Sequence, residues 1–304
     1  MIHLFSDRIV RPDAERSIAS GLMTIDNNVI QALDWTVTDI QTAQAAVEDT
    51  VFDARDYLVT PAFINGHTHL AMCAFRGLNV EAMDGNVVEE LYFRLEGLLS
   101  AEDVRAFTRM GAYESILSGV GGVWDHYYHA EAVAAGLADV GLTGVIAPTL
   151  QDLNGPGMPQ LEAQLEATES IATSEKWRQA GIGAALGPHA TDTVSDDLWR
   201  RIGDLAQKHD LVIHTHAAQS IEEYSRNMTH HGSSPIERLD RLGILDAGRG
   251  VLLVHSLFVT QSDLARLRPE RNILGYCPYS QVQFCFPAEA EAWWAAGQPI
   301  VVGT

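Results

Sequence analysis

Residues 58–69 read LVTPAFINGHTH, an apolar run that ends in two histidines. An apolar run without polar alternation is typical of a strand that is covered on both faces, as in a parallel sheet. His67 and His69 are two residues apart, so both side chains point to the same face of an extended strand. Two imidazoles on one face can bind one metal ion. The stretch therefore predicts a buried strand that carries part of a metal site.

Further apolar runs follow this first one along the chain. Together they occupy residues 58–64, 119–124, 141–147, 181–186, 211–213, 250–254, 272–276 and 299–302. Most are separated by segments with helical spacing, such as 100–118, where Ser100 is a candidate N-cap before a stripe of Val104, Phe107, Met110, Tyr113 and Leu117. Eight such strands favour an α/β fold, a (β/α)8 TIM barrel. The alternative is an open doubly wound sheet, but no glycine-rich phosphate motif follows any strand.

The first 57 residues follow a different pattern. Short β-type runs at 18–25 and 35–40 are separated by turn formers such as Asp26, Asn27 and Asn28. We therefore expect a small all-β unit over residues 1–57 and a barrel over residues 58–304.

The composition limits the partners and the compartment. The 304 residues hold 20 Lys and Arg against 40 Asp and Glu, for a formal net charge of −20. Such a surface repels phosphate backbones and anionic lipids, so we expect no nucleic acid and no membrane as partners. No apolar stretch approaches the roughly 18 residues of a membrane span, and no signal peptide is recognised at the start. The three cysteines form no CxxC pair, which favours free thiols in the cytoplasm.

Histidines gather where these strands end. Eight of the 12 histidines lie at or just past the predicted strand ends, namely His67, His69, His126, His129, His189, His214, His216 and His255. In a parallel barrel the chemistry is found at the carboxyl ends of the strands. We therefore expect a metal-dependent enzyme whose site is built mainly from imidazoles. His189 and His255 are the candidate catalytic residues, and either could act as a general acid–base or stabilise a developing oxyanion.

His67, His69 and His216 are the predicted metal ligands. His216 lies nearer the strand end than His214, which we interpret as a core residue or as a residue that supports a ligand. A carboxylate is the expected fourth ligand, with one position open for water. No lysine lies within 181–188 to bridge two metals, so we expect one divalent ion. Zn²⁺ is the first choice, and Co²⁺, Fe²⁺ or Mn²⁺ also suit histidine and carboxylate ligands.

Several motifs together resemble the amidohydrolase superfamily. Within this superfamily, the motifs resemble the branch that contains cytosine, guanine and S-adenosylhomocysteine deaminases and triazine hydrolases. The motifs are PAFINGHTHL (61–70), LEGLLSAED (95–103), SGVGGVWD (118–125), GPH (187–189), IHTHAA (213–218), VHS (254–256) and CPYS (277–280). The resemblance implies that His67, His69 and His216 bind the metal and that His255 is the catalytic histidine beside it. It also implies that His189 and Glu96 contact substrate, and that the N-terminal unit is part of a small β-sandwich.

Two features depart from this family pattern. The deaminases have a proton-carrying glutamate three residues after the fifth-strand histidine, and this chain has Gln219 there. An amide cannot carry a proton through a catalytic cycle, so we assign Gln219 to substrate binding. The family also has an aspartate ligand after a Gly-Thr at the end of the eighth strand, and this sequence stops at Thr304. We therefore expect a barrel truncated in its eighth strand, and a longer protein or a second polypeptide piece that carries the remainder.

These observations predict a mononuclear metal-dependent hydrolase acting on a small molecule. Gln219 favours cleavage of a C–N bond, or a carbamoyl C–S bond, in an amide, carbamate, thiocarbamate or substituted urea. One alternative is an aminohydrolase that deaminates a heterocycle, and another is a metal-binding homologue without catalysis. Side chains expected near the substrate are Met72, Phe75, Met83, Tyr92 and Phe93. We also expect a homo-oligomer.

Overall fold

The structure, a computed structural model, describes residues 1–11, 18–78, 86–284 and 286–304. The chain divides into two compact units, Met1–Ala62 and Phe63–Thr304. None of the described helices has the length and apolar character that crossing a membrane requires.

The first unit contains one four-stranded sheet in the order β3-β2-β1-β4. Its strands are β1 (Ile2–Val10), β2 (Ile18–Asp26), β3 (Val29–Asp34) and β4 (Val51–Asp53), of which β1 and β4 are parallel and the other pairs antiparallel. Asn27 and Asn28 have φ values of 48° and 62°, which suit the tight turn between β2 and β3. The described residues of this unit form a single sheet, so the second layer of the expected β-sandwich is not confirmed.

One expected strand in this unit is wrong. The run at 35–40 was predicted as a strand, but the chain turns there and helix α1 (Ile40–Ala46) begins. The Asp39 side chain caps this helix by accepting a hydrogen bond from the Thr42 N–H at 2.8 Å. Ile40 and Ala43 then pack against Phe5 in the core of the unit. The capping aspartate therefore prevails over the β propensity of the preceding residues.

The second unit is built on parallel strands. They are β5 (Phe63–Thr68), β6 (Val120–Tyr127), β7 (Thr143–Leu150), β8 (Ile182–Ala184) with its short continuation β9 (Gly187–Pro188), β10 (Val212–Ala217), β11 (Gly250–His255), β12 (Asn272–Tyr276) and β13 (Ile300–Val302). Two rows are hydrogen-bonded, β5-β6-β7-β8 and β10-β11-β12-β13, and β9 pairs with β7. All eight predicted strand regions are present, and the fourth is split into β8 and β9.

Backbone hydrogen bonds join the two rows into a ring. On one side the Leu186 N–H donates to Val212 O at 2.9 Å, and the His214 N–H donates to Leu186 O at 2.8 Å. On the other side the Thr304 N–H donates to His67 O at 2.7 Å. The unit is therefore a closed (β/α)8-type barrel, as the sequence predicts. Its first strand begins at Phe63, later than the apolar run suggests, because Val59 is hydrogen-bonded to Arg8 and Val10 in the first unit.

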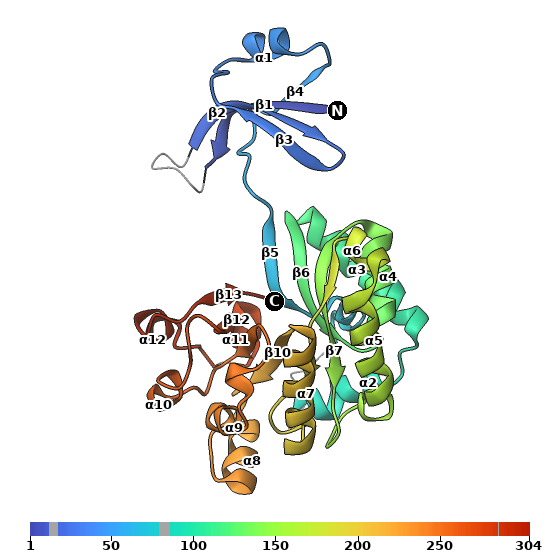
Figure 1. Cartoon of the computed structure of the whole chain (residues 1–304), viewed down its shortest axis with the longest axis vertical. Coiled ribbons are helices and arrows are strands. Elements are labelled where there is room, and N and C mark those ends of the chain that lie inside the picture. The colour runs from blue at the N-terminus through green and yellow to red at the C-terminus, as the bar shows by residue number, and fades with distance from the viewer. Residues whose placement is uncertain (12–17, 79–85, 285) are drawn as a thin grey trace. The chain divides into compact units, whose positions relative to one another are not determined.

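Helices connect the strands of the barrel. They are α2 (Phe93–Glu96), α3 (Ala101–Leu117), α4 (Ala130–Val140), α5 (Leu161–Thr173), α6 (Glu175–Gln179), α7 (Asp196–His209), α8 (Ile221–His231), α9 (Pro235–Arg241), α10 (Gln261–Leu264), α11 (Pro278–Phe284) and α12 (Ala290–Ala295). Figure 1 shows α3, α4 and α5 beside β6 and β7. The barrel strands are consequently buried between these helices and the interior.

The packed face of helix α3 differs in part from the predicted one. Its N-cap is Ser100, as predicted, in a capping box with Asp103. The expected apolar stripe is packed only at its start, where Val104 is buried and Phe107 packs against the core, whereas Met110, Tyr113 and Leu117 are exposed. The buried side is made of small residues such as Gly111, where an added Cβ would lie 2.6 Å from Leu70 O. Close approach to the turn at Leu70–Phe75 therefore selects this face, and hydrophobicity alone does not.

Candidate metal centre

The predicted histidines meet at the carboxyl ends of the barrel strands. His67 lies near the end of β5, His216 near the end of β10 and His255 at the last position of β11. The His67 ring centroid is 4.7 Å from that of His69, 4.9 Å from that of His216 and 5.7 Å from that of His255. The rings of His126, His189 and His214 surround this group. Histidines from five strand regions thus form one cluster.

Three imidazole nitrogens converge within this cluster. The His216 Nε2 atom lies 3.3 Å from His67 Nε2 and 3.3 Å from His69 Nε2. Nitrogens about 2.0–2.1 Å from a tetrahedral zinc ion are separated by about 3.3–3.4 Å. These two spacings therefore fit a divalent metal bound by His67, His69 and His216.

The Nδ1 atom of each of these three histidine rings also has a hydrogen-bond partner. The His216 Nδ1 atom lies 2.8 Å from His189 O, and His69 Nδ1 contacts His126 O. The His67 Nδ1 atom lies 2.8 Å from His214 Nε2. A proton on each Nδ1 satisfies these acceptors and leaves each Nε2 lone pair available to a metal. His214 therefore lies behind His67.

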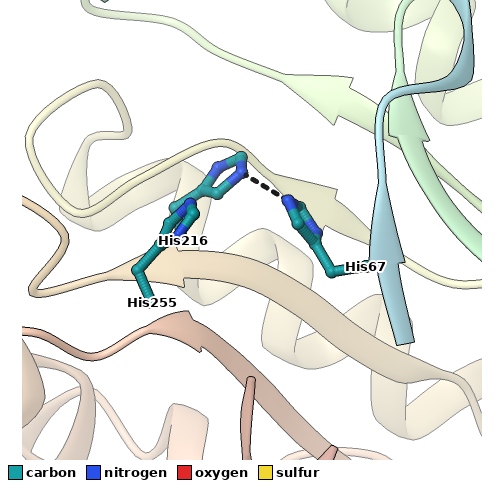
Figure 2. A group of neighbouring side chains, drawn as sticks. All are labelled: His67, His216 and His255. Carbon is teal, nitrogen blue, oxygen red and sulfur yellow. Dashed lines mark hydrogen bonds between the residues drawn. The ribbon is translucent and has the colours of Figure 1, made fainter. Parts of the chain in front are cut away.

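His255 gives the centre an alternative third ligand. One ligand nitrogen each from His67, His216 and His255 lie within 4.8 Å of one another, and Figure 2 shows these three side chains together. The His255 ring stacks on His216 with a centroid distance of 5.4 Å. His255 and Ser256 have φ values of 71° and 50°, a left-handed conformation that is unfavourable for these residue types. The backbone thus turns sharply where His255 enters the cluster.

Burial keeps these imidazoles neutral. Desolvation, assisted by neighbouring imidazoles, lowers the pKa of His67 and His216 well below the usual value. It lowers the pKa of His189 and His255 to about 3. Neutral imidazole is the form that binds a metal ion. The cluster is therefore prepared for a cation at neutral pH.

Two buried carboxyl groups lie near the histidines. Asp125 Oδ2 accepts a hydrogen bond from the Leu70 N–H at 2.7 Å and so fixes the chain just after His69. Burial raises the pKa of Asp125 to about 7 and that of Glu96 to about 8. Part of the Glu96 side chain remains accessible from the cavity. The motif that ends in Asp125 does not by itself predict a role for this residue.

The histidines line a cavity of about 610 Å³. Its wall includes the predicted site residues His67, His69, Glu96, His189, His216, Gln219 and His255. Met72, Phe75, Tyr92 and Phe93 also line it, whereas Met83 lies outside the described residues. This volume and mixture of apolar and polar groups suit a small molecule.

The segment around Gln219 has no carboxylate in the position where the family pattern has one. The Gln219 N–H donates to Glu223 Oε2 at 2.7 Å, and the Thr191 hydroxyl donates to Glu223 Oε1. Glu223 is buried and is absent from the described walls of the cavity, so it supports the backbone instead of facing substrate. Glu222 faces a smaller adjoining cavity.

Comparisons with known proteins agree with this architecture. The chain is 32% identical over 238 residues to 5'-deoxyadenosine deaminase of Methanothrix thermoacetophila, which covers 78% of this chain and 55% of the relative. It is 29% identical over 260 residues to 5-methylthioadenosine/S-adenosylhomocysteine deaminase of Moorella thermoacetica, covering 84% and 59%. The chain thus spans less than two thirds of the length of these curated relatives.

Solved structures with the same fold include several metal-dependent hydrolases. An adenosine deaminase from Xanthomonas campestris with bound zinc superposes with a TM-score of 0.82 at 22% identity, covering 100% of this chain and 68% of that one. Guanine deaminase from C. acetobutylicum gives 0.84 at 16% identity, covering 99% and 74%. The Amidohydrolase family model matches residues 58–285. This chain belongs to the amidohydrolase family of metal-dependent hydrolases.

Proposed function

We propose that the protein is a metal-dependent aminohydrolase that releases ammonia from the purine ring of an adenosine derivative. The observation that carries this proposal is the match over 78% of the chain to a deaminase of such a compound. The converging histidine nitrogens support it, because hydrolytic deamination requires an activated water molecule. Compared with the carbonyl hydrolysis favoured by the sequence alone, deamination fits the curated relatives better.

In this proposal His67, His69 and His216 hold one divalent ion, with Zn²⁺ as first choice and Co²⁺, Fe²⁺ or Mn²⁺ as alternatives. Such an ion lowers the pKa of bound water to about 7 and polarises the group under attack. His214, His126 and His189 orient the ligand rings through the contacts described above. The backbone at the end of β13 lies beside this centre, because the Thr304 N–H bonds to His67 O.

The remaining polar groups act on the substrate. His255 lies against His216 and is neutral at pH 7, so its nitrogens can accept or donate a proton beside the reacting carbon. His189 Nδ1 is 3.0 Å from Thr193 Oγ1, which leaves Nε2 for the substrate. Glu96 is protonated at neutral pH because its pKa is about 8, so it can donate a hydrogen bond to the substrate.

Gln219 favours a second candidate function. Its amide can bind substrate but cannot move a proton from water to a ring nitrogen. Hydrolysis of an amide, carbamate, thiocarbamate or substituted urea has no ring nitrogen to protonate, so it agrees better with Gln219. A metal-binding homologue without catalysis is the third candidate.

One set of assays separates these candidates. The zinc-loaded protein is incubated with aminated purine nucleosides and, separately, with amides, carbamates and substituted ureas, and ammonia and the carbonyl products are measured. Ammonia from the nucleosides supports the deaminase. Turnover of the carbonyl compounds alone would replace it with the second candidate, and bound zinc without any turnover would favour the third.

The variant Gln219→Glu sharpens this test. It restores the carboxylate of the deaminase pattern, so deamination should rise about tenfold or more. Deamination that does not rise would contradict the deaminase assignment, and a large gain on carbonyl substrates would contradict the second candidate function.

We also propose a cytoplasmic homo-oligomer in which residues 1–57 belong to a β-sandwich. The low cysteine content supports the cytoplasmic location, and the described sheet of this unit would be one layer of such a sandwich. Light scattering of the purified protein measures the oligomeric state, and a monomer would reject that part.

A further inference from the structure

The metal cavity adjoins a smaller one, which we call the acidic lobe. This lobe has a volume of about 180 Å³ and shares His189, Gln219 and His255 with the main cavity. Its wall also carries the carboxyl groups of Glu89, Asp192 and Glu222. A substrate whose reacting group lies at the histidines can therefore extend its other end into the lobe.

The lobe has an excess of negative charge. Arg226 Nη1 contacts Glu89 and lies 2.9 Å from Asp192 Oδ2, so one cation serves two carboxyl groups. Among the residues that the structure describes, Glu222 has neither an ion pair nor a side-chain hydrogen bond. The described wall of the lobe includes neither lysine nor arginine. Carboxylates in a partly enclosed site create a negative potential that favours cationic groups.

The larger cavity does not offset this charge. Its described wall contains one basic residue, Arg76, whose Nη2 atom is bound to Glu114 Oε2 at 2.6 Å. Residues 79–85, whose structure is not described, read NVEAMDG and contain no lysine or arginine. An anionic group of a substrate would therefore find no available cation in either described wall.

His189 lies between the lobe and the metal cavity. Its side chain is more than nine-tenths buried, and its Nδ1 atom is bound to Thr193. Its Nε2 atom has no partner among the described residues, although the ring lines both cavities. This nitrogen is therefore free to hydrogen-bond a molecule that occupies the cavities. Phe93 and Phe286 add aromatic surface to the lobe, and such surface also attracts cations.

We propose that the acidic lobe binds the end of the substrate remote from the reacting amino group and selects a cationic end over an anionic one. This inference rests on the proposed function for the identity of the reacting end. It assigns Glu222 as a specificity-determining residue, with Glu89 and Asp192 as the further source of negative potential. The preferred substrate class is therefore an adenosine derivative with an alkylammonium tail.

The test compares three adenosine 5'-thioethers with the same two-carbon tail, ending in an ammonium, a methyl or a carboxylate group. The zinc-loaded protein is assayed for ammonia release, and kcat/KM is expected to fall in that order. The kcat/KM of the ammonium compound should exceed that of the carboxylate compound by at least about a hundredfold. The reason is that the carboxylates of the lobe attract an ammonium group and repel a carboxylate group. Equal values, or a preference for the carboxylate, would overturn the proposal.

Two variants locate the effect. Glu222→Lys reverses the charge in the lobe and should reduce the ammonium-to-carboxylate ratio at least about tenfold. Glu166→Lys, on the outer helix α5, makes the same change in net charge at an exposed position outside both cavities, and it should leave the ratio unchanged. Equal effects of the two variants would mean that overall charge, and not the lobe, sets the preference. Thermal denaturation checks that both variants are folded.

Calorimetry separates this proposal from the proposed function. The same three thioethers are titrated into the zinc-loaded protein, and the dissociation constants are compared. If no ammonia is released but the ammonium compound binds at least about tenfold more tightly than the carboxylate compound, the deaminase assignment fails and the lobe assignment stands. Identical dissociation constants would reject the lobe assignment whether or not ammonia is released.

Discussion

The two ends of the substrate cavity differ in charge and in how their side chains are held. At the metal centre, neutral histidines from five strand regions hold one another through short contacts, such as the 2.8 Å separation between His67 and His214. In the acidic lobe, Glu89 from the helical turn Val88–Tyr92 and Asp192 from a loop share Arg226, and Glu222 in the first turn of α8 has no described partner. Under the proposed function, the strand ends position the reacting groups, and the side chains of the lobe select the remote end of the substrate.

The largest expected effect comes from removing a ligand at the metal centre. The His216 Nε2 atom lies 3.3 Å from both His67 Nε2 and His69 Nε2. His216→Ala should therefore reduce turnover by more than about a thousandfold. It should also reduce bound zinc, which is measured by elemental analysis after dialysis. Retention of one zinc ion per chain by this variant would show that His216 is not a ligand.

A smaller effect on zinc affinity is expected from replacing His214, which contacts the predicted ligand His67. His214→Phe removes the acceptor for His67 Nδ1, and such losses weaken metal binding by about 10–100-fold. His214→Gln keeps an acceptor and should weaken binding less. Competition with a chelator measures the zinc affinity of both variants. If the two variants bind zinc equally well, the contact between His67 and His214 does not support the metal.

The metal-free protein should lose stability as the pH falls below about 6.5. His189, His214 and His255 have folded pKa values of about 3, so the unfolded chain binds protons there before the folded chain does. Each group contributes about 1 kcal/mol between pH 6.5 and 5.5.

Buried carboxyl groups act in the opposite direction. Asp125 and Glu96 have raised folded pKa values of about 7 and 8, so their contribution to stability grows as the pH falls from these values toward the unfolded pKa. Burial also raises the pKa of Glu223 to about 7, but it lowers the pKa of His67, His126 and His216 as well, so the buried histidines outnumber the carboxyl groups and their effect should prevail. Urea denaturation of chelator-treated protein at pH 6.5 and 5.5 measures the balance, and an unchanged midpoint would contradict it.

The smallest expected effect concerns the acidic lobe. Arg226→Met removes the cation shared by Glu89 and Asp192, so the preference for a cationic tail should rise about threefold. Arg201→Met breaks an exposed pair with Glu162 on the outer helices and serves as the matched control. The ratio of kcat/KM for the ammonium and carboxylate thioethers is the measurement. A lower ratio in Arg226→Met would indicate that Arg226 does not offset the charge of the lobe.

The barrel and its histidines could be predicted because both depend on local patterns. Apolar runs mark buried parallel strands, and the spacing of His67 and His69 places both on one face. Local patterns were misleading where packing decides. The exposed Met110 and Tyr113 of α3, and the turn before α1, show that close approach and capping override hydrophobicity and β propensity.

The sequence by itself determined the family, the barrel and the residues that can bind a metal, because strand-end positions follow from the order of the strands. Only the tertiary structure decided which nitrogens converge, that His214 lies behind His67, and that Glu223 supports the backbone while Glu222 faces a cavity. It also brought Glu89 and Asp192 together around Arg226. The reason is physical: these contacts join residues far apart in the chain, and no local spacing encodes the distance between two loops.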